Sequence, residues 1–247
     1  MSKTKTSVRI FIGFMAFLMI VSTLGLYIVI ILGNKNQSEE QTAANQAQIK
    51  LNDNIQIQQS KSSTKAAELS KQYYTEFVAY KNEVKSFNAA SVTELKTRDL
   101  RAGDGAEVKE DFTDYSMYYI GWLPNETIFD SSISNDALAM PLPGSGSYIT
   151  GWNEGVIGMK VGGIREITIP SDKAYGTTGA GEEGQDGYIA PNTPLKFIVM
   201  AIPKVDSIPF SKGTYELCLQ VNKPYVDQYG KEAVDQYLCG AYGNEEK

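Results

Sequence analysis

Three short apolar segments, separated by turns rich in Gly and Asp, constrain the fold of the central region most strongly. They are rich in aromatic and β-branched residues, which favour strands, and they span residues 115–122, 164–169 and 195–202. Another stretch, residues 152–160, has apolar side chains at three- and four-residue spacing. This spacing is typical of a short helix with one apolar face. The pattern is therefore compatible with a sheet that has a short helix packed against it.

A series of short motifs runs through the same region in a fixed order. It comprises Tyr-Ile-Gly at 119–121, Phe-Asp-Ser-Ser at 129–132, Gly-Trp-Asn-Glu-Gly at 151–155, Gly-Met-Lys-Val-Gly-Gly at 158–163, Ile-Pro at 169–170, Ala-Tyr-Gly at 174–176 and Ile-Ala-Pro-Asn-Thr-Pro-Leu at 189–195. In this order and spacing the motifs resemble those of the FKBP-type peptidyl-prolyl cis-trans isomerases. The resemblance implies an α+β fold over residues 93–206, in which an antiparallel sheet wraps around a short helix.

The resemblance also implies an active site, position by position. The residues that match the family's catalytic positions are Tyr119, Phe129, Asp130, Ile149, Trp152 and Tyr175, and those that match its other substrate-binding positions are Tyr148, Tyr188, Ile189 and Phe197. By the same resemblance Trp152 lies under the proline ring, and the Ile149 N–H and Tyr175 hydroxyl donate hydrogen bonds to the peptide. Each aromatic residue taken alone would also fit an ordinary hydrophobic core.

The implied reaction does not require an acid–base pair. Rotation about an X–Pro bond breaks no bond, but it crosses a barrier of roughly 18–20 kcal/mol. An apolar site that removes water from the amide carbonyl, together with a few fixed donors, stabilises the twisted amide. The chain contains no histidine, which excludes His-based triads and His metal sites. We expect an enzyme that uses neither a cofactor nor a metal.

Some positions depart from the family's pattern. Residues 137–144 lack the phenylalanine that the family usually supplies there, and the loop over residues 177–187 is longer, glycine-rich and acidic. These differences keep a second hypothesis open, in which the domain is a weakly catalytic or inactive binding module or chaperone at the cell surface.

Residues 10–32 form an apolar run without a charged side chain. About 20 apolar residues are enough to cross a bilayer as a helix, and a cleaved signal usually has an apolar stretch of roughly 7–15 residues. We therefore expect an uncleaved transmembrane anchor, with a cleaved signal or a buried soluble helix as alternatives. Basic residues concentrate in the tail 1–9, which predicts a cytoplasmic N-terminus, a single-pass location in the cell membrane and an extracytoplasmic isomerase domain.

The charge of the chain bears on its partners. The formal net charge is -6, which argues against nucleic acid because phosphate neutralisation needs clustered Lys and Arg. Given the family resemblance and the expected location, we predict that the clients are proline-containing segments of exported polypeptides.

Two segments precede the domain. Residues 33–63 are rich in Gln, Asn, Ser and Lys, which predicts a solvated, flexible linker. Apolar residues then recur at three- and four-residue intervals within residues 64–92, which predicts an amphipathic helix capped by Ser63 or Thr64. Its apolar face could pack on the domain that follows or form a homodimer through residues 64–92.

Residues 207–247 extend beyond the family's core and contain both cysteines, Cys218 and Cys239. Two such thiols outside the cytoplasm commonly pair. We expect a disulfide that stabilises a small hairpin, with two buried free thiols as the alternative. A helix within residues 221–238 also fits the apolar pattern.

Overall fold

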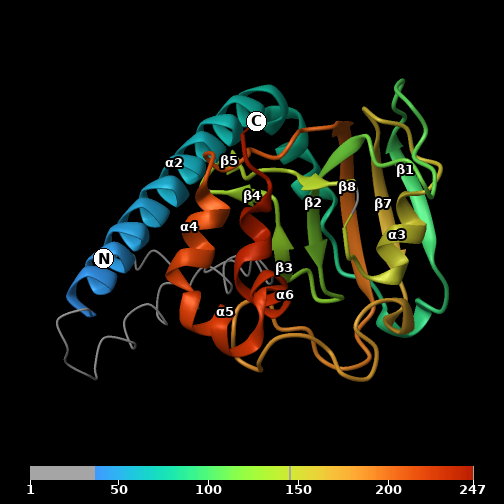
Figure 1. The fold of residues 1–247 in the computed structure, drawn as a ribbon. Coiled ribbons are helices and arrows are strands. Elements are labelled where there is room, and N and C mark those ends of the chain that lie inside the picture. The colour runs from blue at the N-terminus through green and yellow to red at the C-terminus, as the bar shows by residue number, and fades with distance from the viewer. Residues whose placement is uncertain (1–36, 145, 247) are drawn as a thin grey trace, which may run out of the picture. The chain divides into compact units, whose positions relative to one another are not determined.

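The computed structural model describes residues 37–144 and 146–246. The expected cytoplasmic tail and transmembrane anchor, residues 1–9 and 10–32, lie outside the described residues. In the part that is described, no helix is both long enough and apolar enough to span a bilayer. The described chain divides into two compact units, a sheet unit of residues 65–206 and a helical unit of residues 37–64 and 207–246. Figure 1 labels most of their α-helices and strands.

An antiparallel sheet with the strand order β1-β7-β8-β2-β3 forms the centre of the sheet unit. Strands β3 and β6 share one edge of β2, and β2 pairs with β8 along its whole length. A separate hairpin of β4 and β5 follows β3. The strands are β1 (Lys96–Arg101), β2 (Tyr115–Trp122), β3 (Ile128–Ser131), β4 (Ile133–Ser134), β5 (Ala137–Leu138), β6 (Leu142–Pro143), β7 (Ile164–Ile169) and β8 (Leu195–Pro203).

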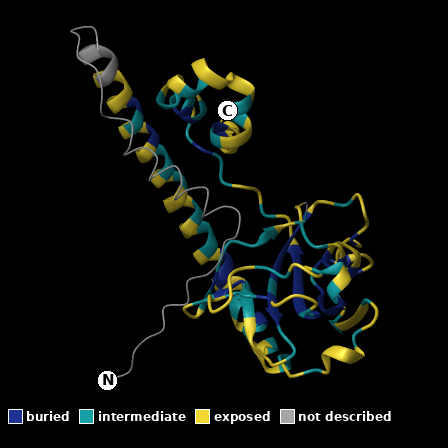
Figure 2. Cartoon of the chain, turned by 90° about the horizontal axis from the view of Figure 1, so that it is seen from below, coloured by how far each residue is buried: buried dark blue, intermediate teal, exposed yellow. Residues whose placement is uncertain are grey.

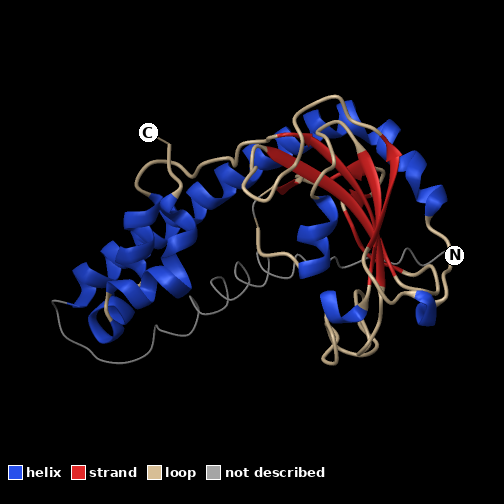
Figure 3. Cartoon of the chain, turned by 90° about the vertical axis from the view of Figure 1, so that its right-hand side faces the viewer, coloured by secondary structure: helices blue, strands red, loops and turns tan. Residues whose placement is uncertain are grey.

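Helices cover both faces of this sheet, as Figure 3 shows. Those that contribute to the sheet unit are α2 (Gln37–Val78), η1 (Ala79–Glu83), η2 (Ala89–Ser91), α3 (Thr150–Val156) and η3 (Ser171–Lys173). The short helix α3 packs on one face, and the C-terminal part of α2 packs on the other. The prediction of an antiparallel sheet with a short helix is confirmed, but the helix ends at Val156 and not at residue 160, because Gly158 has a positive φ of 79°.

Side chains of β2 alternate between two hydrophobic cores, because successive residues of a strand point to opposite faces. Met117 and Tyr119 pack in the core that contains α3, whereas Tyr118 and Ile120 pack in the core that contains Phe77 of α2. The central strands are buried along most of their length, as Figure 2 shows. Burial on both faces explains why the predicted strands are nearly continuous apolar runs.

Helix α2 corrects the expected flexible linker over residues 33–63, because residues 37–63 are helical. Leu51 is fully buried and Ile55 packs beside it in the core of the helical unit. These two apolar residues are one helical turn apart, so they form a narrow buried face on this part of the helix, where Ile49 and Ile57 are exposed. The composition is therefore that of a mostly exposed helix and not of a linker.

The expected amphipathic helix over residues 64–92 also has different bounds. Ser63 and Thr64 do not cap a helix start. Their hydroxyls donate to backbone carbonyls one turn earlier, at 2.9 and 3.0 Å, within the continuous helix α2. The helix ends at Val78, well before the predicted end. Tyr73 and Phe77 pack against Tyr118 with ring centroids 6.0 and 6.1 Å apart, so this apolar face covers the chain's own sheet.

The C-terminal segment of the helical unit is helical, and the expected hairpin there is wrong. It contains α4 (Thr214–Val221), α5 (Lys223–Tyr229), α6 (Lys231–Val234), η4 (Asp235–Cys239) and η5 (Gly240–Gly243). Cys218 of α4 and Cys239 of η4 form a disulfide with an S–S distance of 2.09 Å. Both cysteines are buried in a core with Leu51 and Tyr242. The disulfide therefore joins helices.

Candidate active site

Tyr119 on β2 and Asp130 on β3 come together because the two strands pair. The Tyr119 hydroxyl donates a hydrogen bond to Asp130 Oδ2 at 2.5 Å, and the Ser131 N–H donates to Asp130 Oδ1 at 2.8 Å. Each carboxylate oxygen thus accepts a hydrogen bond from the same strand pair. These bonds hold the carboxylate in one orientation beside the tyrosine ring.

Ser132 fixes the backbone of Tyr119. The Tyr119 N–H donates to Ser132 Oγ at 2.9 Å, and the Ser132 N–H donates to the Tyr119 carbonyl at 2.8 Å. Ser132 is buried. The sequence pattern assigns this serine no role, although its place in the Phe-Asp-Ser-Ser motif is the signal that points to it.

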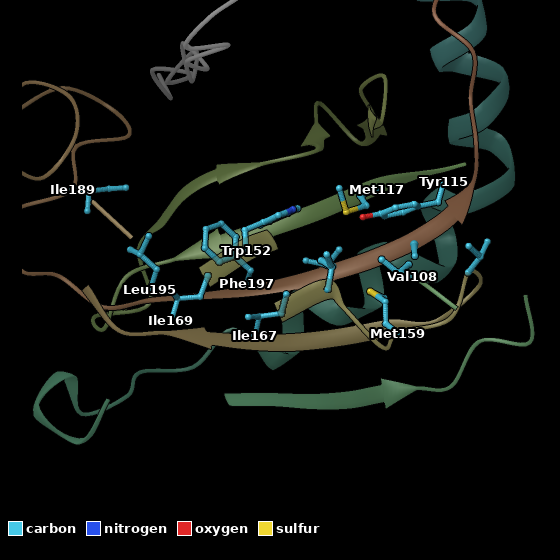
Figure 4. Packing of buried hydrophobic residues seen from close by; sticks show 14 residues of the cluster. Val108, Tyr115, Met117, Trp152, Met159, Ile167, Ile169, Ile189, Leu195 and Phe197 are labelled. Atoms are coloured by element: carbon cyan, nitrogen blue, oxygen red, sulfur yellow. The ribbon is translucent and has the colours of Figure 1, made fainter. Parts of the chain in front are cut away.

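Five aromatic side chains pack together between the sheet and α3, and we call them the aromatic cluster: Tyr119, Phe129, Tyr148, Trp152 and Phe197. Trp152 meets Tyr119 and Phe197 edge to face, with ring centroids 5.5 and 5.1 Å apart. Phe129 meets Phe197 edge to face at 5.5 Å, and Tyr148 lies 5.6 Å from Trp152. Figure 4 shows Trp152 and Phe197 among the core side chains. Such pairs are favourable beyond the area that they bury.

Two glycines allow close packing at the site, one between aromatic rings and β2 and one between α3 and β7. A Cβ on Gly121 would lie 2.7 Å from ring atoms of both Phe129 and Phe197, and a Cβ on Gly151 would lie 2.3 Å from Ile169 Cγ2. Distances this short would force the neighbouring atoms to move. Glycine at these positions therefore lets two aromatic rings approach β2 and lets α3 approach β7.

Tyr148 and Ile149 lead into α3. Ile149 is the N-cap residue, and its carbonyl accepts hydrogen bonds from the backbone N–H groups of the helix at 3.0 and 3.2 Å. Its own N–H has no hydrogen-bond partner among the described residues. The Tyr148 hydroxyl donates to the Pro143 carbonyl at 2.7 Å, and burial, with a smaller effect from Tyr115, raises the pKa of Tyr148 to about 12. Tyr148 is therefore a protonated donor at neutral pH.

Tyr175 lies in the turn that follows η3. Its side chain is 37% exposed, and its pKa is raised first by burial and then by the negative charge of Asp130. Hydrogen bonds hold the turn, including one from the Gly176 N–H to the Ser171 carbonyl at 2.8 Å. The hydroxyl remains protonated at neutral pH and is partly open to solvent.

The two predicted loop residues have different environments. Ile189 is buried within the core that contains the aromatic cluster, and it is held by a pair of backbone hydrogen bonds with Ala180 at 2.8 and 2.9 Å. Tyr188 is half-buried, and no ring contact joins it to the aromatic cluster in the part of the chain described. The structure therefore brings Ile189, but not the ring of Tyr188, into the packed site.

The segment that lacks the family's phenylalanine, residues 137–144, has its two leucines in different cores, and Leu142 packs against the core that contains the aromatic cluster. Leu138 is buried in the core on the opposite face of the sheet, with Phe77 and Tyr118. It therefore does not extend the aromatic cluster. Within the described ranges, no group of three or more metal-binding side chains comes together.

An antiparallel sheet that packs over a short helix, with an apolar aromatic cluster between them, fits the FKBP-like class of fold. The family model described as FKBP-type peptidyl-prolyl cis-trans isomerase matches residues 105–202. An FK506-binding protein of Neisseria meningitidis serogroup A is 43% identical over 105 residues, which cover 42% of this chain and 91% of that protein. An FK506-binding protein of Streptomyces anulatus is 39% identical over 106 residues, which cover 42% of this chain and 82% of that protein.

A crystal structure of a peptidyl-prolyl cis-trans isomerase from Pseudomonas syringae pv. tomato is 27% identical, with a TM-score of 0.37, and the match covers 51% of this chain and 87% of that one. The match to nearly the whole Neisseria protein shows that this chain belongs to the family of FKBP-type peptidyl-prolyl cis-trans isomerases. The protein is thus an enzyme that interconverts the cis and trans forms of X–Pro bonds.

Proposed function

We propose that the protein isomerises X–Pro bonds of exported polypeptides in an apolar pocket formed by the aromatic cluster with Ile149, Tyr175 and Ile189. One observation carries the proposal: rings meet edge to face around Trp152, directly beside the Tyr119–Asp130 hydrogen bond. This arrangement combines a surface that excludes water with polar groups fixed in advance. A twisted amide gains from both.

The proposed roles are those that the family resemblance implies, and the placement of the residues supports them. The proline ring rests on Trp152, and the Ile149 N–H donates to a substrate carbonyl. Tyr175 donates its hydroxyl hydrogen bond to the peptide, while Tyr119 and Asp130 form the polar side of the pocket. The reacting carbonyl leaves water for an apolar environment, which disfavours the charge-separated resonance form of the amide. The C–N bond then has less double-bond character and rotates more easily.

Enzyme kinetics with purified full-length protein in detergent test this proposal. The substrates are short peptides that differ in the residue before proline. We expect clear acceleration by the wild-type protein and a loss of about 10-fold or more in kcat/KM for Phe129→Ala and Asp130→Ala. The matched controls are Tyr229→Ala, which removes a ring that is 61% exposed, and Asp111→Asn, at an exposed position.

Trp152→Leu separates the enzyme from the alternative binding module. Loss of turnover in a folded Trp152→Leu protein supports the enzymatic pocket. If the folded wild-type protein binds the peptides but accelerates none of them, the pocket proposal fails and the binding module becomes the better account.

We also propose that residues 10–32 anchor the protein in the cell membrane, with the isomerase domain outside the cytoplasm. The length of the apolar run and the basic tail before it support this. The Cys218–Cys239 disulfide adds support, because disulfides persist in oxidising compartments. Retention in membranes at alkaline pH, and digestion of the domain by protease added outside the cell, are the expected results. Recovery in the soluble fraction would count against an anchor.

A further inference from the structure

A buried hydrogen bond connects α2 to the β4–β5 hairpin. The Leu138 N–H donates to Ser70 Oγ at 2.8 Å, and Ser70 and Leu138 are only 7% and 3% exposed. Ser70 lies beside Leu69 on a helix surface that otherwise contributes apolar side chains to the packing, including Tyr73 and Phe77. Packing alone does not require a hydroxyl at this position. The hydroxyl satisfies a buried backbone donor that would otherwise have no partner, which is costly in an apolar environment.

Hydrogen bonds continue from this hairpin to the active site. The Ala139 N–H, next to Leu138, donates to the Ser132 carbonyl at 2.9 Å. Ser132 exchanges two hydrogen bonds with Tyr119, whose hydroxyl donates to Asp130. The backbone and these bonds, all between 2.5 and 2.9 Å long, thus connect α2 to the carboxylate beside the aromatic cluster.

Two further contacts attach the same part of α2 to the same strands. At the tip of the hairpin, the Tyr74 hydroxyl donates to Asp136 Oδ1 at 3.3 Å. On the face opposite the aromatic cluster, Tyr73 and Phe77 pack on Tyr118, the neighbour of Tyr119. The helix therefore packs on the face of β2 opposite the aromatic cluster and is hydrogen-bonded to the β4–β5 hairpin.

We propose that Ser70 is a positioning residue for the isomerase site. By fixing the hairpin through Leu138, it holds Ser132 and therefore the orientation of Tyr119 and Asp130. This inference rests on the roles proposed above for Tyr119 and Asp130. It extends the functional part of the enzyme to a helix outside the residues that the family model matches.

The test compares three variants of the full-length protein. We expect Ser70→Ala to lower kcat about 3- to 10-fold with little change in KM, and to shift the backbone amide NMR signals of Tyr119 and Ser132. Ser70→Thr keeps a hydroxyl and should restore most of the activity. Ser63→Ala is the matched control, because that serine lies on the same helix but is exposed and bonds only within it.

A double variant tests whether Ser70 acts through Tyr119. In a Tyr119→Phe background we expect Ser70→Ala to cause no further loss of kcat. The hydrogen bond from the Tyr119 hydroxyl to Asp130, which Ser70 is proposed to orient, is already absent there. If Ser70→Ala does not fold, Tyr74→Phe loosens the same hairpin more gently and should lower kcat by a smaller factor.

The inference is overturned if the folded Ser70→Ala protein has the kcat of the wild type. It is also overturned if the loss of kcat in the double variant equals the product of the losses in the Ser70→Ala and Tyr119→Phe single variants. Wild-type kcat in the folded Tyr74→Phe protein also overturns it if that variant has to replace Ser70→Ala. These outcomes differ from failure of the proposed function, in which the wild-type protein itself does not accelerate isomerisation.

Discussion

At the scale of single residues, the site depends on a position where any side chain would be too large. Gly121 lies on β2 opposite Asp130, and the rings of Phe129 and Phe197 occupy the space that a Cβ would need. The edge-to-face contact between these two rings therefore requires glycine at this point of the strand.

Gly121→Ala should lower both stability and activity. The added methyl group must displace two packed rings, and overpacking of this kind typically costs about 1–3 kcal/mol. We expect a lower midpoint of urea unfolding and a lower kcat/KM. Gly243→Ala is the matched control, because a Cβ added there would meet no other atom within 4 Å. Equal effects of the two substitutions would contradict the packing argument.

Tyr148 gives the site a measurable response to alkaline pH. Its pKa is raised from 10.0 to about 12, mainly by burial. Its contribution to stability is fully present below pH 10 and is lost as the pH rises toward 12, because the unfolded chain ionises first. Tyr148→Phe should be less stable than wild type at about pH 8, since it loses the hydrogen bond to Pro143. The difference in unfolding free energy should narrow by about pH 11.5, and a constant difference would contradict the raised pKa.

At the scale of elements, α3 depends on an arginine from the neighbouring strand. Arg165 on β7 donates from Nη1 to the carbonyls of Gly155 and Ile157, at 3.1 and 2.8 Å, at the C-terminal end of the helix. It also binds Asp99 of β1 through Nε and Nη2, at 2.6 and 3.3 Å. The guanidinium satisfies carbonyls that the helix leaves unpaired, and its charge is favourable there. It thereby fixes the helix that carries Trp152.

Arg165→Met should destabilise the protein by about 2–4 kcal/mol, because it removes a guanidinium that is only 8% exposed and leaves helix carbonyls unsatisfied, whereas its ion-pair partner Asp99 is 53% exposed. Chemical unfolding followed by tryptophan fluorescence measures this effect. Lys204→Met removes an exposed ion pair with Asp114 and serves as the control, for which we expect little change. A similar loss in both variants would show that the buried position of Arg165 has no special importance.

The elements also show what the sequence can predict. Strands β2 and β7 have the predicted bounds, because burial on both faces leaves an apolar run with clear ends. The first half of α2 is not predictable in the same way, because its buried face contains few apolar residues and its partners lie at the other end of the chain. The contact of Leu138 with Ser70, 68 residues away, leaves no local pattern at all.

In the candidate site, too, some features have a local sequence pattern and others do not. The motifs predict the residues of the aromatic cluster, and the structure brings Tyr119, Phe129 and Trp152 into one packed group with ring contacts. The hydrogen bond of Ser70 could not be predicted, because a small polar residue has the same local appearance in a core as on a surface. Ser132 is signalled only by its place in the Phe-Asp-Ser-Ser motif.

At the scale of the whole molecule, the disulfide belongs to a different unit from the site. Cys218 and Cys239 lie in the helical unit, whereas the aromatic cluster lies in the sheet unit. The double variant Cys218→Ser/Cys239→Ser should destabilise the helical unit by about 3 kcal/mol, as expected for a loop of about 20 residues. Hydrogen exchange should show faster exchange in α4 and η4 with kcat/KM nearly unchanged. A parallel loss of activity would contradict this independence.

The path of the chain through the two units sets an order for biosynthesis. Residues 37–64 leave the ribosome before the sheet unit, but the segment that buries Leu51 is made after the entire sheet unit. Because domains generally fold as units during synthesis, the isomerase is expected to be complete while the helical unit still lacks its second half. Thiol trapping on released chains of increasing length, kept under oxidising conditions, checks this order. Cys218 should stay reactive until the chain has passed Cys239. The sheet unit with the isomerase site would then be folded before the Cys218–Cys239 disulfide forms.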